Sequence, residues 1–305
     1  MDVASTASPA AAPAVSPWTR QRGTGTVGKV ILIGILALLG IAKVVVKEMN
    51  RQGEVAEPRQ EDRAADREQM LVRGENDAVI SLATQAIDGG KLTRTQAALA
   101  HAQRALAHRN KGELDEAIAD CDVAVRLNAK LAVAWTYRAV AYDDRGDLDR
   151  AIADYSKAIE LDPRDSVAFS NRGLAHYHQG GRDLAIADLS KAIELDPADG
   201  LAYGSRGLVY VEAGKYEEAV RDCSKEIDLR PKDPVAYHNR GLAYTHLDRG
   251  DQAIADFSKA IGLDPTDSLS YTMRGQAYDR VRDHTRAAAD QEKAQELGRP
   301  GADKR

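Results

Sequence analysis

The chain has 305 residues, with 42 Lys and Arg against 47 Asp and Glu and a net charge of −5. This slightly acidic balance argues against a general nucleic-acid binder, because such proteins usually carry a basic surplus. Aromatic residues make up 5% of the chain, and Trp18 is the only one before Trp135, so one evenly built globular core is excluded.

The first 29 residues are rich in Ala, Ser, Thr and Pro. Pro9, Pro13 and Pro17 interrupt any helix, and the segment has too little apolar surface to build a core. We therefore expect residues 1–29 to form a disordered tail.

Residues 30–46 form an apolar segment of 17 residues whose only charge is Lys43. A helix of this length covers roughly 25 Å, the lower limit for a membrane span. We expect a single transmembrane helix or uncleaved signal anchor. Two alternatives remain open: a cleaved signal peptide, because Gly40-Ile41-Ala42 is a small-x-small site, and a buried helix of a soluble protein. Flanking Lys and Arg residues favour a cytoplasmic C-terminal region only slightly, so the side of the membrane is undecided.

Residues 47–75 are mostly charged or small, with both signs mixed. This composition predicts a solvated spacer or a loose charged helix that holds the rest of the chain away from the bilayer. In the following region, 76–97, the apolar spacing of Asp77–Asp88 predicts a lone helix that caps the next segment.

From residue 98 the sequence repeats with a period of 34 residues. The clearest copies are Ala151–Pro163, Ala185–Pro197 and Ala253–Pro265, which are nearly identical. The period defines six units, 98–131, 132–165, 166–199, 200–233, 234–267 and 268–301. In the unit 234–267 the turn glycine falls at Gly250, two places late, so we expect its turn to differ in detail.

Each unit carries the same pattern of large and small residues. Position 4 is aromatic except for His101, position 11 is Tyr or His, position 8 is Ala or Gly, and position 20 is Ala in all six units. This pattern resembles the tetratricopeptide repeat family, whose repeats have rings, small residues and a closing proline at these positions. The resemblance covers residues 98–301. It implies an all-α, right-handed superhelical solenoid of six helix-turn-helix repeats, here preceded by one apolar N-terminal helix.

The spacing within a unit supports the same fold. Positions 4, 8 and 11 lie on one face of a helix, and positions 20, 24, 27 and 28 on one face of a second. One such hairpin cannot bury its apolar face alone, whereas stacked hairpins can.

Position 7 is arginine and position 23 is aspartate in all six units. Two ladders of opposite charge on facing helices predict repeated ion pairs that set the register of the helices. Their central members are Arg138, Arg172, Arg206 and Arg240 with Asp154, Asp188, Asp222 and Asp256. The alternative is that the arginines also reach acidic groups of a ligand.

The remaining residues do not form a catalytic or metal-binding pattern. Cys121 and Cys223 both occupy position 24, three repeats apart, so they are predicted to be buried and too distant for a disulfide. Known nucleotide, metalloprotease and hydrolase motifs are absent from the sequence, and we expect neither catalysis nor a cofactor or metal.

The family resemblance implies a peptide-binding groove along the first helices, faced by positions 2, 5, 6, 9, 12 and 13. The candidate groove residues are Tyr137, Asn171, Tyr177, His178, His238, Asn239 and His246. Asn171 and Asn239 can each bond a peptide backbone through a donor and an acceptor, although both can also be solvated polar groups.

The sequence therefore predicts a non-enzymatic, membrane-tethered scaffold that binds a protein or peptide partner in its groove and no nucleic acid. The membrane contact would be made by residues 30–46. The alternative is a secreted or periplasmic factor that assists envelope or polymer assembly after signal cleavage.

Overall fold

The computed structural model describes residues 74–298 together with Arg67 and Leu71. The chain divides into two units, Met1–Glu57 and Pro58–Arg305, and every described residue belongs to the second. The predicted tail at 1–29 and the predicted apolar helix at 30–46 lie outside the described residues. Among the residues that are described, no helix has the length and apolar character needed to cross a membrane.

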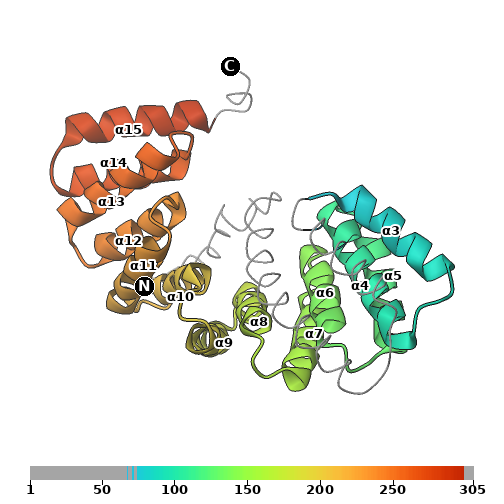
Figure 1. Cartoon of the computed structure of the whole chain (residues 1–305). Coiled ribbons are helices and arrows are strands. Elements are labelled where there is room, and N and C mark those ends of the chain that lie inside the picture. The colour runs from blue at the N-terminus through green and yellow to red at the C-terminus, as the bar shows by residue number, and fades with distance from the viewer. Residues whose placement is uncertain (1–66, 68–70, 72–73, 299–305) are drawn as a thin grey trace, which may run out of the picture. The chain divides into compact units, whose positions relative to one another are not determined.

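The described part is built from 13 helices and contains no strand (Figure 1). They are α3 (Asn76–Asp88), α4 (Arg94–Asn110), α5 (Leu114–Leu127), α6 (Ala132–Asp144), α7 (Leu148–Leu161), α8 (Ser166–His178), α9 (Arg182–Leu195), α10 (Gly200–Glu212), α11 (Tyr216–Leu229), α12 (Pro234–His246), α13 (Gly250–Leu263), α14 (Ser268–Arg280) and α15 (His284–Leu297).

The helices form six hairpins that stack in chain order, from α4 with α5 to α14 with α15. The second helix of each hairpin also packs against the first helix of the next, as α5 does against α6 and α7 against α8. The predicted all-helical solenoid is confirmed. The first hairpin differs from the others because α4 begins at Arg94, one turn before residue 98, and is capped by a reciprocal bond between Thr93 and Gln96.

Three of the five links between hairpins, those that lead to α8, α10 and α14, have the sequence Asp-Pro-x-Asp. In the link to α8, Asp162 accepts a hydrogen bond from the amide of Arg164, and Asp165 then accepts one from the amide of Ala168 in the first turn of the helix. The first aspartate makes the turn and the second caps the helix. Asp199, Asp233 and Asp267 are the corresponding caps of α10, α12 and α14.

The turn inside each hairpin needs a residue with positive φ at position 15. Glycine supplies it four times, at Gly112, Gly146, Gly180 and Gly214, with φ between 72° and 85°. The last two hairpins use Asp248 at φ 55° and Arg282 at φ 65° instead. The hydrogen bond that closes the turn has the same length with glycine and with aspartate at position 15. Asp147 N donates to Tyr142 O, and Arg249 N donates to Tyr244 O, both at 2.9 Å. The turn near Gly250 therefore differs only in detail: Asp248 has a smaller φ than the glycines, and its amide lies 3.4 Å from Thr245 O, whereas Gly146 N lies 2.9 Å from Asp143 O. Aspartate tolerates this conformation.

Small residues at position 8 allow the two helices of a hairpin to approach. A Cβ atom added at Gly241 would lie 2.8 Å from the ring of Phe257, and one added at Gly207 would lie 2.7 Å from the sulfur of Cys223. Cys121 and Cys223 are both completely buried, and burial raises the pKa of each thiol. Position 24 is thus a packing position in the first five hairpins, whereas Gln291 at this position of the last hairpin is exposed.

Part of the predicted spacer also contacts the hairpins. Arg67 and Leu71 are buried, and the Nε atom of Arg67 donates to Oε1 of Gln103 on α4 at 2.8 Å. The helix α3 packs against α4, in the place predicted for a capping helix. Arg67, Leu71 and α3 therefore cover part of the surface of the first hairpin.

We predict opposite effects for two turn substitutions. Gly146→Ala should lower the free energy of unfolding by about 1 kcal/mol, because nothing crowds the added Cβ and the cost is that of a left-handed backbone alone. Arg282→Gly should raise it by a similar or smaller amount, since it relieves the same cost. Urea unfolding followed by circular dichroism measures both, and a loss of stability in Arg282→Gly would contradict the account of the turn.

Candidate functional site

The first helices of successive hairpins contact one another as well as their own partners, from α4 with α6 to α12 with α14. They form a continuous layer along one side of the array. We define the inner face as positions 2, 5, 6, 9, 12 and 13 of these helices.

The inner face has an apolar floor that is incompletely buried. Position 2 is Leu or Val in all six hairpins, and each of these side chains is half-buried: Leu99, Val133, Val167, Leu201, Val235 and Leu269. At position 9, Leu174, Leu208 and Leu242 are half-buried as well. Apolar side chains that repeat at the same two positions and stay partly exposed mark a continuous strip rather than scattered surface residues.

The arginines at position 7 point away from the inner face, into their own hairpins. Arg172 donates from Nε to Oδ2 of Asp188 at 2.7 Å and from Nη2 to Oδ1 at 2.8 Å. The same two bonds join Arg104 to Asp120, Arg138 to Asp154, Arg206 to Asp222, Arg240 to Asp256 and Arg274 to Asp290. This two-bond geometry is the strongest that a guanidinium makes with a carboxylate.

In the second to sixth hairpins, the third nitrogen of the arginine reaches back to the preceding hairpin. The Nη1 atom of Arg172 donates to Oγ of Ser156 at 3.0 Å, and Ser190, Ser224 and Ser258 accept the corresponding bonds from the next three arginines. In the second hairpin the acceptor is the carboxylate of Asp122, at 2.6 Å from Arg138. Each of these arginines therefore joins the second helices of two neighbouring repeats.

Aromatic rings at positions 4 and 11 flank the same guanidinium groups. The Cζ atom of Arg240 lies 5.9 Å from the ring centre of Tyr237 and 5.8 Å from that of Tyr244. Such distances are within the range of cation–π attraction. The arginines are thus occupied by structural partners, which favours the structural interpretation of this ladder over ligand binding.

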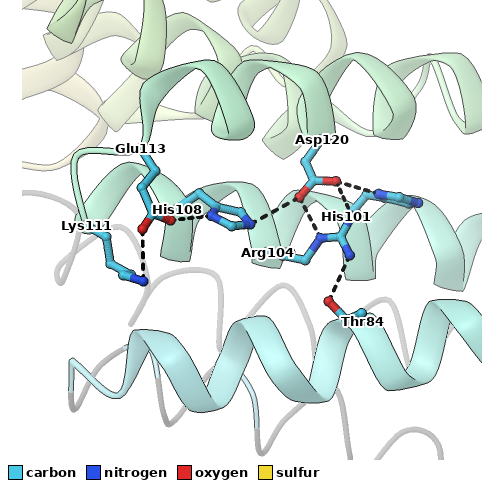
Figure 2. A network of polar contacts seen from close by, with 7 residues as sticks. All are labelled: Thr84, His101, Arg104, His108, Lys111, Glu113 and Asp120. Atoms are coloured by element: carbon cyan, nitrogen blue, oxygen red, sulfur yellow. Dashed lines mark hydrogen bonds and ion pairs between the residues drawn. The ribbon is translucent and has the colours of Figure 1, made fainter.

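The first hairpin replaces both rings with histidines, and a polar network takes their place (Figure 2). His101 Nδ1 donates to Asp120 at 2.8 Å, and His108 Nδ1 donates to Glu113 at 2.6 Å. Burial pushes the pKa of Asp120 up, but the hydrogen bonds from Arg104 and His101 outweigh it and hold that pKa below its ordinary value. Arg104 also donates to Thr84 of α3 at 2.9 Å. The two histidines therefore bind carboxylates of their own hairpin, and Arg104 links this network to α3.

Four of the seven candidate groove residues lie half-buried on α6 and α8. Tyr137 packs against the buried cluster of Ala102, Ala124 and Ala134, and Asn171 lies on α8. Tyr177 packs beside Leu189, and its hydroxyl donates to Glu212 of α10. Burial, and then this hydrogen bond, raise the pKa of Tyr177. The His178 ring lies 5.3 Å from the Tyr177 ring.

The other three candidates lie in different surroundings. His238 is 1% exposed, and its Nδ1 atom lies 2.7 Å from Oγ of Ser270 on α14. Burial lowers the pKa of His238 to about 4, so the ring is neutral at physiological pH. Asn239 is also buried, at 3% exposed. His246 is exposed and stacks on Tyr216 with ring centres 4.5 Å apart. His238 and Asn239 thus belong to the packing between repeats and do not present an open surface.

A second set of contacts between repeats was not expected from the sequence. Position 12 of one first helix meets position 13 of the next: Arg109 binds Asp144, Tyr177 binds Glu212, and Arg280 donates to the backbone oxygen of Thr245. The partners are 35 residues apart in each case. This separation is one period plus one residue, and a search for complementary residues at that spacing would have found two of the pairs.

The described residues hold no group of three or more His, Cys, Asp or Glu side chains placed to bind a metal ion. The chemistry that the inner face offers is that of noncovalent binding: an apolar strip, amide and hydroxyl groups, and a few charges near the C-terminal ends of the helices.

Comparisons with known proteins agree with this architecture. Four family profiles match the chain, one described as "TPR repeat" at residues 141–180 and three as "Tetratricopeptide repeat" at residues 170–234, 234–267 and 269–297. These matches run from the end of α6 to α15. No curated protein matches the chain.

Solved structures with similar folds include three of note. The crystal structure of MamA is 26% identical, with 52% of this chain and 93% of that chain covered and a TM-score of 0.50. YrrB, titled a TPR protein with an unusual peptide-binding site, is 23% identical, with coverages of 62% and 95% and a TM-score of 0.52. The pilF protein of Pseudomonas aeruginosa is 20% identical, with coverages of 67% and 93% and a TM-score of 0.61. Because the identities of YrrB and pilF are so low, these two similarities show a shared fold only.

Removing one carboxylate of the ladder tests its structural role. Asp188 is 8% exposed, whereas the side chain of Arg172 is 20% exposed, so Asp188→Asn should cost about 2 kcal/mol rather than the larger loss of a fully buried pair. Asp183→Asn, on the exposed side of the same helix, is the matched control and should change stability by less than about 0.5 kcal/mol. Equal stability of the two variants would favour a ligand-binding role for Arg172.

Proposed function

The chain belongs to the tetratricopeptide repeat family, and on this basis we propose that it is a non-enzymatic scaffold that binds a protein or peptide segment along the inner face. The observation that carries the proposal is the strip at positions 2 and 9, which is apolar and only half-buried in successive hairpins. YrrB, which shares the fold, is described as having a peptide-binding site.

The side chains beside the strip suit a peptide backbone. Asn171 offers an amide donor and acceptor, Ser205 offers a hydroxyl at the same position of the next repeat, and both are half-buried. Apolar side chains of a bound segment would lie on Val167, Leu201 and Leu174, while its backbone meets these polar groups. Tyr177 and His178 would close this region at the C-terminal end of α8.

We further propose that residues 30–46 tether the scaffold to a membrane. The support is the apolar composition of this segment and its charged flanks. In the alternative function, the segment is a signal peptide, and the repeats act as a secreted or periplasmic factor in envelope or polymer assembly.

Blocking the inner face tests the binding function. Peptides selected from a random display library on the full chain should bind about tenfold or more weakly to the double variant Asn171→Arg/Ser205→Arg, because two long charged side chains would cover the strip. The double variant Leu184→Arg/Ala187→Arg adds the same charge at exposed positions of α9 and should bind normally. Fluorescence anisotropy measures both affinities. Selection of no peptide, or equal weakening by both variants, would count against the inner face as the binding site.

The fate of residues 30–46 tests the tether. The full chain should stay in the membrane fraction after carbonate extraction, whereas Leu36→Arg/Leu39→Arg should release it, because two charges at mid-span cost about 5 kcal/mol or more. N-terminal sequencing of the same material is the control for processing. A mature chain that begins at or near Lys43 would support the secreted alternative and exclude the anchor.

A further inference from the structure

The fourth repeat departs from the others at a position where the rest agree. Position 27 is alanine in five hairpins, at Ala124, Ala158, Ala192, Ala260 and Ala294, but it is Glu226 in the fourth. Position 5 of the same hairpin is Gly204, the one glycine at that position among the six repeats. In the first hairpin these two positions pack together with position 3 of the next repeat, at Ala102, Ala124 and Ala134.

The two departures compensate each other in space. A Cβ atom added at Gly204 would coincide with the carboxyl group of Glu226, whose three terminal atoms all lie within 2.4 Å of it. The missing side chain on α10 therefore makes room for the carboxyl group that α11 inserts. Glu226 is 3% exposed, so this group lies inside the packing between helices.

The charged groups around Glu226 do not balance. Asp199 caps α10, Asp233 caps α12, and Arg230 follows the end of α11, which gives three carboxyl groups against one guanidinium. The Nη1 atom of Arg230 lies 2.9 Å from Asp233 and 3.5 Å from Oε1 of Glu226. Asp199 and Asp233 accept hydrogen bonds from backbone amides of the helices that they cap. Among the described atoms, Oε2 of Glu226 is buried without a hydrogen-bond partner.

A buried carboxyl group in these surroundings keeps its proton. Burial, with a further contribution from Asp233 and against the attraction of Arg230, raises the pKa of Glu226 to about 8. Its pKa in the unfolded chain is close to 4.3. The folded state thus holds one more proton on Glu226 between these values. The contribution of this group to stability is full below about pH 4, falls as pH rises, and levels off above about pH 8.

We propose that the contact of α11 with α10 and α12 is a proton-dependent joint, closed while Glu226 is protonated and loosened when this side chain ionises without a second cation to pair with it. The other hairpins lack such a group at position 27 and do not respond in this way. His238, the buried titratable residue of α12, loses its proton near pH 4 and contributes nothing above pH 6. The array would therefore bend or open at one place along its length, where α11 contacts α10 and α12, as pH rises.

The two cysteines provide a matched pair of reporters for this joint. Cys223 lies one turn before Glu226 on α11 and packs against Gly207 of α10, and Cys121 occupies the same position 24 in the first hairpin. Both are completely buried, so each reacts with a thiol reagent only when its own repeat opens. The ratio of the two rates removes the part of the pH effect that both thiols share. The Glu226→Gln variant, which keeps both cysteines and their other charged neighbours, accounts for the rest.

The experiment labels the full chain with a neutral pyridyl disulfide between pH 6 and pH 9, using Cys121→Ser and Cys223→Ser to assign the two rates. Labelling of Cys223 relative to Cys121 should rise by at least about tenfold over this range. In Glu226→Gln, which keeps the shape of the protonated side chain, the ratio should stay constant. The double variant Gly204→Ser/Glu226→Ala, which copies Ser170 and Ala192 of the third repeat, should also give a constant ratio.

A constant ratio in the unmodified chain would overturn the proposal, as would a pH-dependent ratio that persists in Glu226→Gln. A rise in the labelling of both cysteines together would show that pH acts on the whole array, and it would also exclude a local joint. If Glu226→Gln does not fold, the Gly204→Ser/Glu226→Ala variant decides the outcome by the same ratio. None of these outcomes depends on whether the inner face binds a peptide.

Discussion

One guanidinium group in each repeat fixes the spacing of the whole array. Arg206 illustrates the arrangement: it binds Asp222 on α11, reaches Ser190 on α9 of the preceding repeat, and lies between the rings of Tyr203 and Tyr210. A single planar cation therefore sets the distance between neighbouring second helices and holds the rings of its own helix. Because the partners are directional, the register of one hairpin determines that of the next. Apolar packing alone would allow more freedom, since it has no preferred direction.

Because the arginines are held by structural partners, other positions of the first helices are left for binding. On a helix of 3.6 residues per turn, positions 4, 7, 8 and 11 share one face, and that face is filled by the ladder, its rings and the small residue between them. Positions 2, 6 and 9 lie elsewhere on the helix and carry the half-buried apolar strip with Asn171 and Ser205. Residues that are invariant among the repeats therefore build the array, whereas the positions that vary, such as 6, 12 and 13, are the ones available to the proposed recognition.

The period of 34 residues was enough to predict the helices, the hairpins and the partners of the ladder, because each of these depends on contacts within one unit or between adjacent units. The candidate site was harder to predict. Position number alone placed His238 and Asn239 on the groove, but the depth of a side chain depends on the residue opposite, and Ser270 is small enough for His238 to be buried against it. The bond between Tyr177 and Glu212 was missed because it joins different positions of two repeats. In the turn at Asp248, a backbone that favours glycine accepts aspartate without a change in its closing bond.

A residue that differs from the repeat pattern has one meaning when it is the only change and another when a contacting residue changes with it. Asp248 replaces a glycine alone, and its backbone absorbs the change, so the hairpin keeps its geometry. Glu226 could not enter its position alone, because any side chain at position 5 of α10 would occupy the space of its carboxyl group. Gly204 removes that conflict, and Arg230 replaces the aspartate or asparagine that the other hairpin links carry at the same place. These three changes lie in one junction, and together they replace an alanine contact with a buried ionisable group. Packing alone does not explain such a replacement, because burying an ionisable group costs free energy. In the proposed joint, the packing of the fourth repeat depends on the protonation of this one carboxyl group.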